Sequence, residues 1–181
     1  KVPETFRWAI LGFFIKGAVW GLLGGAVMAA AIEYRRAGWR DRFVWAGLAL
    51  MAAATWAGWK LINEPKLVYF SNRLDRPRPE IWAGLALGAL ALIVWLGRGE
   101  ARKAMWSYAL WGAAGGGAGF AIGAWIQVAG ASRWPEAGID WWKMMEFTFG
   151  LLLGLGYGIA AWLNRRESSG AAVLPQAEPS W

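Results

Sequence analysis

Residues 104–130 have the sequence AMWSYALWGAAGGGAGFAIGAWIQVAG, in which no side chain is charged. As a helix, this run of 27 residues is about 40 Å long at 1.5 Å per residue. The hydrocarbon core of a bilayer is about 30 Å thick, so the run is long enough to cross it. A helix on the surface of a soluble domain would carry a polar face instead. We therefore expect residues 104–130 to form a transmembrane helix.

Four further apolar runs flank this one, at residues 8–32, 43–62, 81–97 and 144–163. In lipid every backbone N–H and C=O group has to be paired within the protein, so that only helices and closed barrels span a membrane. Barrel strands alternate apolar and polar residues, whereas these runs are continuously apolar. The sequence thus predicts an all-α, polytopic transmembrane helix bundle with about five spans. One domain is expected over residues 1–164, with a disordered tail at 165–181 and a short interfacial stretch at 67–70.

The chain contains 19 Lys and Arg against 12 Asp and Glu, which gives a net charge of +7. The basic residues gather at the ends of the apolar runs, where they contact lipid headgroups. We therefore expect a lipid bilayer, and not nucleic acid, as the partner of this charge. Dense basic groups in short segments mark the cytoplasmic side, so the expected location is a bacterial inner membrane with the C-terminus cytoplasmic. These groups comprise Arg35, Arg36, Arg40, Arg42, Arg98, Arg102, Lys103, Arg165 and Arg166.

Neither His nor Cys occurs in the chain. Their absence excludes disulfides, thiolate nucleophiles, Cys-ligated zinc, His-based acid–base catalysis and His ligation of haem. No span carries a pair of carboxylates, and no glycine loop follows a predicted strand. We expect a protein that is not an enzyme, with no catalytic residues, no metal site and no cofactor. Since the chain begins with Lys1, it is expected to be processed or to belong to a longer polypeptide.

Glycines recur at every fourth position in three of the runs. Residues spaced by four lie on one face of a helix, and a face without side chains lets another helix approach closely. Such a glycine zipper gains dispersion contacts in a solvent where no hydrophobic force favours association. One interpretation is ordinary helix packing, and the other is a narrow pore or a grip on a partner's helices. The expected helix-packing residues are Gly17, Gly21, Gly25, Gly115, Gly119, Gly123, Gly150, Gly154 and Gly158.

Two charged side chains fall inside apolar runs, Lys16 in the first and Glu146 near the start of the fifth. In a five-span bundle these two helices run in the same direction. Helical side chains lean toward the helix N-terminus, which brings the Lys16 ammonium toward the level of Glu146. An intramembrane Lys16–Glu146 ion pair is therefore our hypothesis for a site. The alternative is that Lys16 reaches the headgroups alone while Glu146 lies in the wet interface.

Most of the 16 tryptophans fall near the ends of the runs, as in the aromatic belt of membrane proteins. Trp20 and Trp111 lie deeper. They pack either against neighbouring helices or against a lipid tail, a quinone or a pigment.

Two functions fit these features. The first is a non-enzymatic structural or assembly subunit, or the membrane domain of a larger complex. Such a protein forms a homo-oligomer or joins other membrane subunits through its glycine-zipper helices. The second is a small channel or transporter for an ion or small solute, with Lys16 and Glu146 near the pathway. Because polar residues are sparse inside the runs, the first function is favoured.

Overall fold

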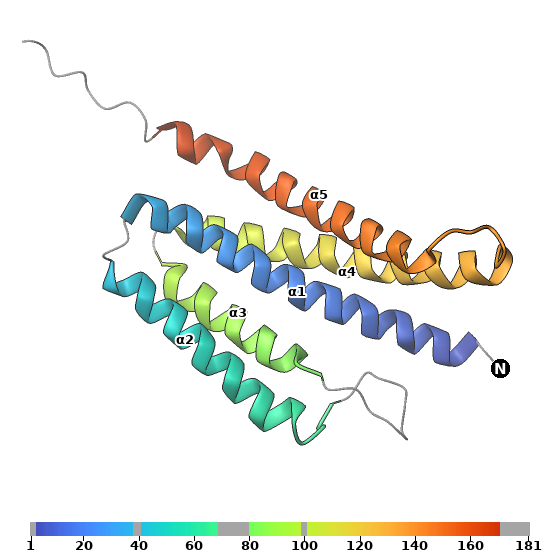
Figure 1. Ribbon diagram of the computed structural model, residues 1–181. Coiled ribbons are helices and arrows are strands. Elements are labelled where there is room, and N and C mark those ends of the chain that lie inside the picture. The colour runs from blue at the N-terminus through green and yellow to red at the C-terminus, as the bar shows by residue number, and fades with distance from the viewer. Residues whose placement is uncertain (1–2, 38–40, 69–79, 99–100, 171–181) are drawn as a thin grey trace, which may run out of the picture.

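The computed structural model describes residues 3–37, 41–68, 80–98 and 101–170, and its regular structure there is entirely helical (Figure 1). The all-α fold expected from the sequence is thereby confirmed. A π-helical turn, Trp59–Asn63, continues α2. The α-helices are α1 (Pro3–Ala37), α2 (Arg42–Gly58), α3 (Trp82–Leu96), α4 (Ala101–Arg133) and α5 (Trp141–Gly170).

Three of these helices are long and apolar enough to cross a membrane. They contain the segments Ala9–Ile32, Ala101–Arg133 and Trp141–Arg165. Helix α3 is apolar but has only 15 residues, about 22 Å at 1.5 Å per residue, and α2 has 17 residues before its π turn. Three of the five expected spans therefore have helices of membrane length, which is compatible with an integral membrane protein.

The last helix extends beyond its predicted end. Residues 165–170 were expected to begin a disordered tail, but α5 continues to Gly170. No Gly or Pro interrupts the chain between Asn164 and Ser169, so nothing in the local sequence stops the helix. In addition, the Arg165 guanidinium lies over the Trp162 ring, 4.6 Å from its centroid. Residues 171–181 of the expected tail lie outside the described residues, as do residues 69 and 70 of the short interfacial stretch.

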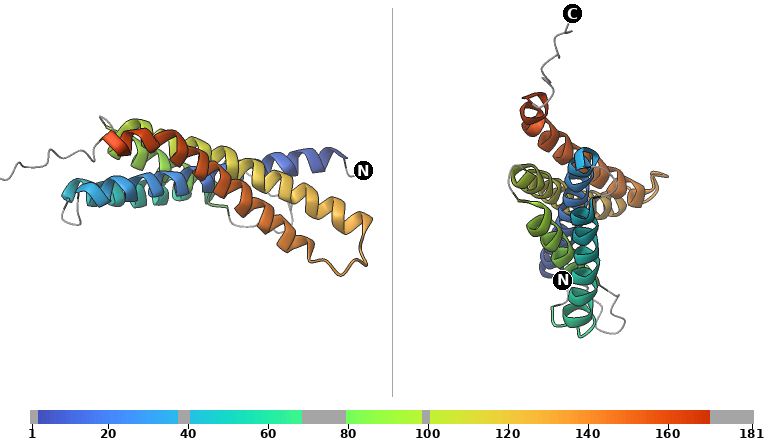
Figure 2. Two further views of the ribbon diagram at one scale, coloured as in Figure 1. Left: turned by 90° about the horizontal axis from the view of Figure 1, so that it is seen from above. Right: turned by 90° about the vertical axis from the view of Figure 1, so that its left-hand side faces the viewer.

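The helices form a row whose order in space differs from their order in the sequence. Helix α1 packs on α4 on one side and on α3 on the other (Figures 1 and 2). Helix α5 covers the far side of α4, and α2 covers the far side of α3. The row therefore runs α2, α3, α1, α4, α5. Because α4 lies between them, α1 and α5 touch at few points.

Glycines allow α1 and α4 to meet backbone to backbone. A methyl group added to any of the three predicted packing glycines of α1 would collide with backbone atoms of α4. A close approach of this kind replaces side-chain bulk with many dispersion contacts between backbones. The pairs are Gly17 with Gly116, Gly21 with Gly112, and Gly25 with Tyr108.

The predicted glycines of α4 face its other neighbour, α5. Helix α4 thus carries two glycine faces, one toward each neighbour. The glycine spacing predicted the face toward α5 but not Gly112 and Gly116, which contact α1. On the α5 side the pairs are Gly115 with Leu152, Gly119 with Phe149, and Gly123 with Met145.

Helix α5 packs through a different face from the predicted one. Methyl groups at Gly150, Gly154 or Gly158 would meet no atom of the described residues within 4 Å. The buried residues of α5 include Gly156 and Ala160 instead. Positions 154 and 156 are about 200° apart around a helix, so they cannot face the same neighbour. Among the described residues, nothing therefore fulfils the expected packing role of these three glycines.

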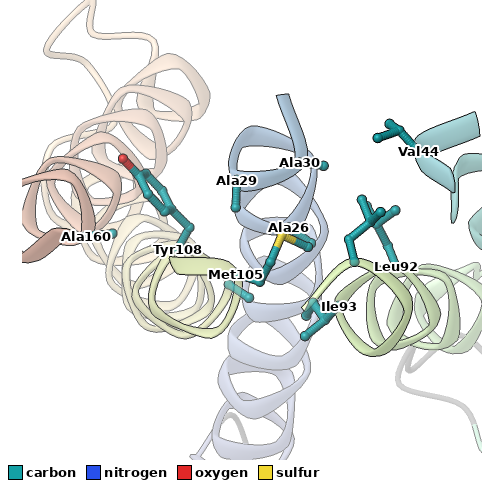
Figure 3. Packing of buried hydrophobic residues seen from close by; sticks show 11 residues of the cluster. Ala26, Ala29, Ala30, Val44, Leu92, Ile93, Met105, Tyr108 and Ala160 are labelled. Carbon is teal, nitrogen blue, oxygen red and sulfur yellow. The ribbon is translucent and has the colours of Figure 1, made fainter. Parts of the chain in front are cut away.

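Small side chains on α1 let it pack closely on both sides. In Figure 3 the alanines Ala26, Ala29 and Ala30 lie between Met105 and Tyr108 of α4 and Leu92 and Ile93 of α3. The three alanines are at most 4% exposed. Larger side chains at these positions would push α3 and α4 away from α1. The central position of α1 therefore depends on a stripe of small residues.

We predict that Gly21→Leu lowers the free energy of unfolding by about 3 kcal/mol, since the new side chain has to displace the backbone of α4. Gly154→Leu should change the stability of the isolated chain by less than about 0.5 kcal/mol, because its position is open. Unfolding by sodium dodecyl sulfate from a mild detergent, followed by circular dichroism, measures both. Equal losses in the two variants would contradict this packing.

Candidate functional site

A buried ion pair joins α1 to the start of α3. The Lys16 ammonium lies 3.2 Å from Oε1 of Glu80, whose side chain is 2% exposed, while that of Lys16 is 32% exposed. A buried charge without a partner is strongly unfavourable, and pairing offsets much of that cost. The two residues therefore form a charged centre within an otherwise apolar helix contact.

The start of α3 is fixed by a side chain from the neighbouring helix. Oδ1 of Asn63 accepts hydrogen bonds from the backbone N–H groups of Ala83, at 3.1 Å, and Gly84, at 3.2 Å. The first N–H groups of a helix have no partner within that helix, so Asn63 acts as its cap. The positive end of the α3 dipole also favours a carboxylate at Glu80. Cap and ion pair together set the position of α3 against α1 and α2.

A π turn precedes the capping residue. The Glu64 N–H donates to the Trp59 carbonyl at 2.8 Å, the five-residue spacing of a π-helix. Such a turn contains one residue more than an α-helical turn and so shifts the face on which the following side chains lie. Asn63, at the end of this turn, is 6% exposed. The π turn therefore places one polar side chain, that of Asn63, at a buried position from which it can cap α3.

A pocket of about 250 Å³ opens beside the ion pair. Lys16 and Glu80 contribute its polar atoms, and its apolar walls include Trp20 of α1 together with Ile81, Trp82 and Leu85. Nε1 of Trp82 donates to the Val68 carbonyl at 3.4 Å. Ligand pockets usually measure about 300–1,000 Å³, so this one suits a ring or a headgroup and not a large molecule.

The hypothesis of a Lys16–Glu146 ion pair is wrong in this structure. Glu146 is exposed on α5 and accepts a hydrogen bond at Oε1 from Nε1 of Trp142, 2.8 Å away on the same helix. Since α4 lies between α1 and α5, the two charged side chains are kept apart. Lys16 therefore pairs with an acid from α3, its neighbour on the other side.

In the sequence, Glu80 lies directly before the apolar run at residues 81–97 and was not considered as a partner of Lys16. Alternate helices of an up-and-down bundle run in the same direction. The start of α3 is therefore expected near the level of Lys16, just as the start of α5 is. An acidic residue directly before an apolar run is also typical of a helix N-terminus. Glu80 was thus detectable as a candidate partner. The cap from Asn63 had no comparable signal.

Two further polar contacts link α5 to the rest of the bundle. The Tyr157 hydroxyl donates to the carbonyl of Gly21 on α1 at 3.2 Å. Nδ2 of Asn164 donates to Oγ of Ser107 on α4 at 2.9 Å. Among the described residues, no three acidic side chains come close enough together to hold a metal ion.

The outer face of α5 is a second candidate surface. Gly150, Gly154 and Gly158 lie open along it, next to Phe147, which is 66% exposed, and Leu151, which is 59% exposed. This combination of a bare backbone ridge with large apolar side chains resembles the surface that α4 presents to α1. We refer to these five residues as the α5 outer face.

No family model, curated protein or solved structure gives a significant match to this chain. Its function has therefore to be argued from the site and the surface described above.

We predict that Lys16→Met lowers the free energy of unfolding by about 2–3 kcal/mol, because it removes the ammonium group that pairs with the buried Glu80 carboxylate. The partial exposure of Lys16 keeps the loss below that of a fully buried pair. The double variant Lys16→Met/Glu80→Gln should recover most of this loss, and Glu146→Gln should have little effect. Detergent unfolding measures all three, and a larger effect at Glu146 than at Lys16 would contradict the assignment.

Proposed function

We propose that this chain is a non-enzymatic membrane subunit, or the membrane domain of a larger complex, that assembles with other membrane helices through the α5 outer face. Three helices of membrane length are compatible with an integral membrane protein. The observation that carries the proposal is the glycine ridge at Gly150, Gly154 and Gly158, which no described part of the chain covers.

The proposed contact forms in lipid and not in water. Because acyl chains are as apolar as leucine, helices associate in a membrane mainly through close van der Waals packing. The ridge from Gly150 to Gly158 spans eight steps of helical rise and gives about 12 Å of backbone that another helix can approach. Within this chain, the contact of α1 with α4 is an example of such an approach, with Gly21 against Gly112.

The proposed partner is α5 of a second copy, or a glycine-bearing helix of another membrane subunit. Two α5 outer faces are self-complementary, since each offers a ridge at Gly154 and flanking bulk at Phe147 and Leu151. Isologous contacts of this kind close into dimers. The charged pair of Lys16 and Glu80 lies on the other side of the row and takes no part in this contact.

For the topology, we propose that the α2–α3 pair completes a five-span arrangement in a bacterial inner membrane with the C-terminus cytoplasmic. The start of α1 and the end of α5 lie at opposite ends of the bundle (Figure 1). Short basic segments support the cytoplasmic assignment of the end at which α5 finishes. The described residues in these segments are Arg35, Arg42, Arg98, Arg102, Lys103 and Arg165.

In mild detergent we expect the wild-type protein to migrate as an assembly larger than the single chain of 19.9 kDa. Gly154→Leu should release the single chain, weakening association at least tenfold, because the new side chain separates the two ridges. Native mass spectrometry and analytical ultracentrifugation measure the change. As a control, Leu110→Ile alters an exposed apolar residue of α4 and should leave the assembly intact. A wild-type protein that is monomeric, or a Gly154→Leu variant that still assembles, would contradict the proposal.

A small channel or transporter is the second candidate function, and the Lys16–Glu80 pair beside a pocket favours it. Ionisable residues within membrane spans often mark ion or substrate pathways. Compared with the sequence hypothesis, Glu80 takes the place of Glu146 near the pathway. The first function is preferred because Lys16 and Glu80 are paired and Glu80 is almost fully buried.

Ion flux in proteoliposomes distinguishes the two functions. If the chain transports ions, the Lys16→Met/Glu80→Gln variant should change the flux of K⁺, Na⁺ or Cl⁻ at least tenfold relative to the wild type. If the chain is an assembly subunit, flux should equal that of empty vesicles for both proteins. The Glu146→Gln variant serves as the matched control.

A further inference from the structure

We infer that the pocket beside Lys16 and Glu80 binds the carbonyl group of a neutral membrane lipid, with the Lys16 ammonium as the hydrogen-bond donor. This inference is independent of the assembly role, because the pocket lies at the contact of α1 with α3 and α5 packs on the far side of α4.

The Lys16 ammonium supplies hydrogen-bond donors to the pocket. An ammonium group has three N–H donors. Among the described residues, the acceptor that pairs with the Lys16 ammonium is the Glu80 carboxylate. The Lys16 side chain is about one-third exposed while that of Glu80 is almost fully covered. A group that enters the pocket therefore meets the remaining N–H donors of Lys16 before it meets the carboxylate.

The charge of the site selects against ions. Lys16 already has a carboxylate partner in Glu80, so a second anion at the Lys16 ammonium would be repelled by that carboxylate in surroundings of low dielectric constant. A bound cation would be repelled by the accessible Lys16 and screened from the covered Glu80. A neutral acceptor such as a carbonyl oxygen accepts a charge-assisted hydrogen bond and leaves the balance unchanged.

The position of the pocket along the bundle favours a lipid. Lys16 lies seven residues after Ala9, where the apolar part of α1 begins, about 10 Å along the helix. At this level the α2–α3 pair ends, since Asn63 caps α3 there, and the nearby Lys60–Glu64 ion pair is about half exposed. Ester carbonyls of bilayer lipids lie at the boundary between the hydrocarbon core and the polar interface. Because a lysine side chain can extend toward the polar interface, the Lys16 ammonium comes within reach of such carbonyls.

The aromatic walls of the pocket suit the apolar part of the same lipid. Trp20 is exposed and lies with Trp82 beside the ion pair, and tryptophan side chains are favoured where apolar and polar surroundings meet. The pocket of about 250 Å³ admits a glycerol ester or a quinone ring, while the acyl or isoprenoid chains remain outside. The shared chemistry is a carbonyl acceptor on an apolar body, and its two sources are a bilayer ester lipid and a free quinone.

The test compares two phosphatidylcholines of equal chain length, one ester-linked and one ether-linked, so that only the carbonyl groups differ. Delipidated wild-type protein in mild detergent is titrated with each lipid and analysed by native mass spectrometry. We expect the first bound lipid to be retained about tenfold more tightly in the ester form, the ratio that one charge-assisted hydrogen bond supplies. Equal retention of the two lipids would overturn the inference.

Variants test whether Lys16 causes the preference for the ester lipid. Lys16→Met/Glu80→Gln removes the donor without leaving a buried charge, so it should bind ester and ether lipids equally. Lys143→Met serves as the control, because Lys143 is highly exposed at the start of α5 and lies outside the pocket. Its preference for the ester lipid should match the wild type. A double variant that retains the preference would show that Lys16 is not the donor and would overturn the inference.

A measurement on the unaltered protein avoids dependence on variants that fold poorly. Ester lipid labelled with ¹³C at its carbonyl groups should show, in infrared spectra of the wild-type complex, a band at lower frequency than in protein-free bilayers. Absence of this band at saturating protein would overturn the inference. Addition of a decyl-substituted benzoquinone then identifies the source. Displacement of the labelled lipid supports a free quinone as the source of the carbonyl acceptor, and retention of the lipid supports a bilayer ester.

Discussion

The backbone contact between α1 and α4 is the constraint on which the rest of the bundle depends. Where Gly21 meets Gly112, neither helix has a side chain to hold the other away, and the gain in dispersion contacts is realised without any hydrophobic force. This contact sets α4 between α1 and α5, and it leaves the opposite side of α1 to α3. Lys16, on α1, therefore meets the start of α3, and its counter-charge is Glu80. The glycine contact thus determines the position of the charged site.

The sequence predicted the helices well because the requirements for a helix of membrane length are simple. A run such as residues 104–130 has to be long, apolar and helical, and each of these properties is local. Pairing between helices is not local. Soluble helices reveal their buried face by its apolar residues, but a membrane helix is apolar on all faces, so spacing alone has to identify the contact. Gly115 and Gly119 were found in this way, whereas for α5 the same spacing selected Gly154, whose open position no described residue contacts.

The candidate site was half predictable for a related reason. Lys16 was conspicuous because it is a charge within an apolar run, but its partner depended on which helix lies beside α1. Glu80 and Glu146 both precede or begin helices that run in the direction of α1, and only the position of α4 distinguishes between them. The capping role of Asn63 could not be predicted. Its hydrogen bonds to Ala83 and Gly84 join residues about twenty positions apart, and Asn63 itself lies at the end of a π turn. Non-local hydrogen bonds of this kind leave no periodic pattern in a sequence.

The unequal lengths of the helices also bear on the membrane itself. Helix α4 has 33 residues and α3 has 15, which correspond to about 50 Å and 22 Å of axial rise. In the five-span arrangement proposed above, a bilayer in contact with both sides of the row would be compressed beside α3 and stretched beside α4, with an energetic cost for each ångström of mismatch. Neighbouring proteins with a matching step in height would relieve that deformation. The profile of the bundle can therefore orient adjacent molecules before any side chain of one touches the other.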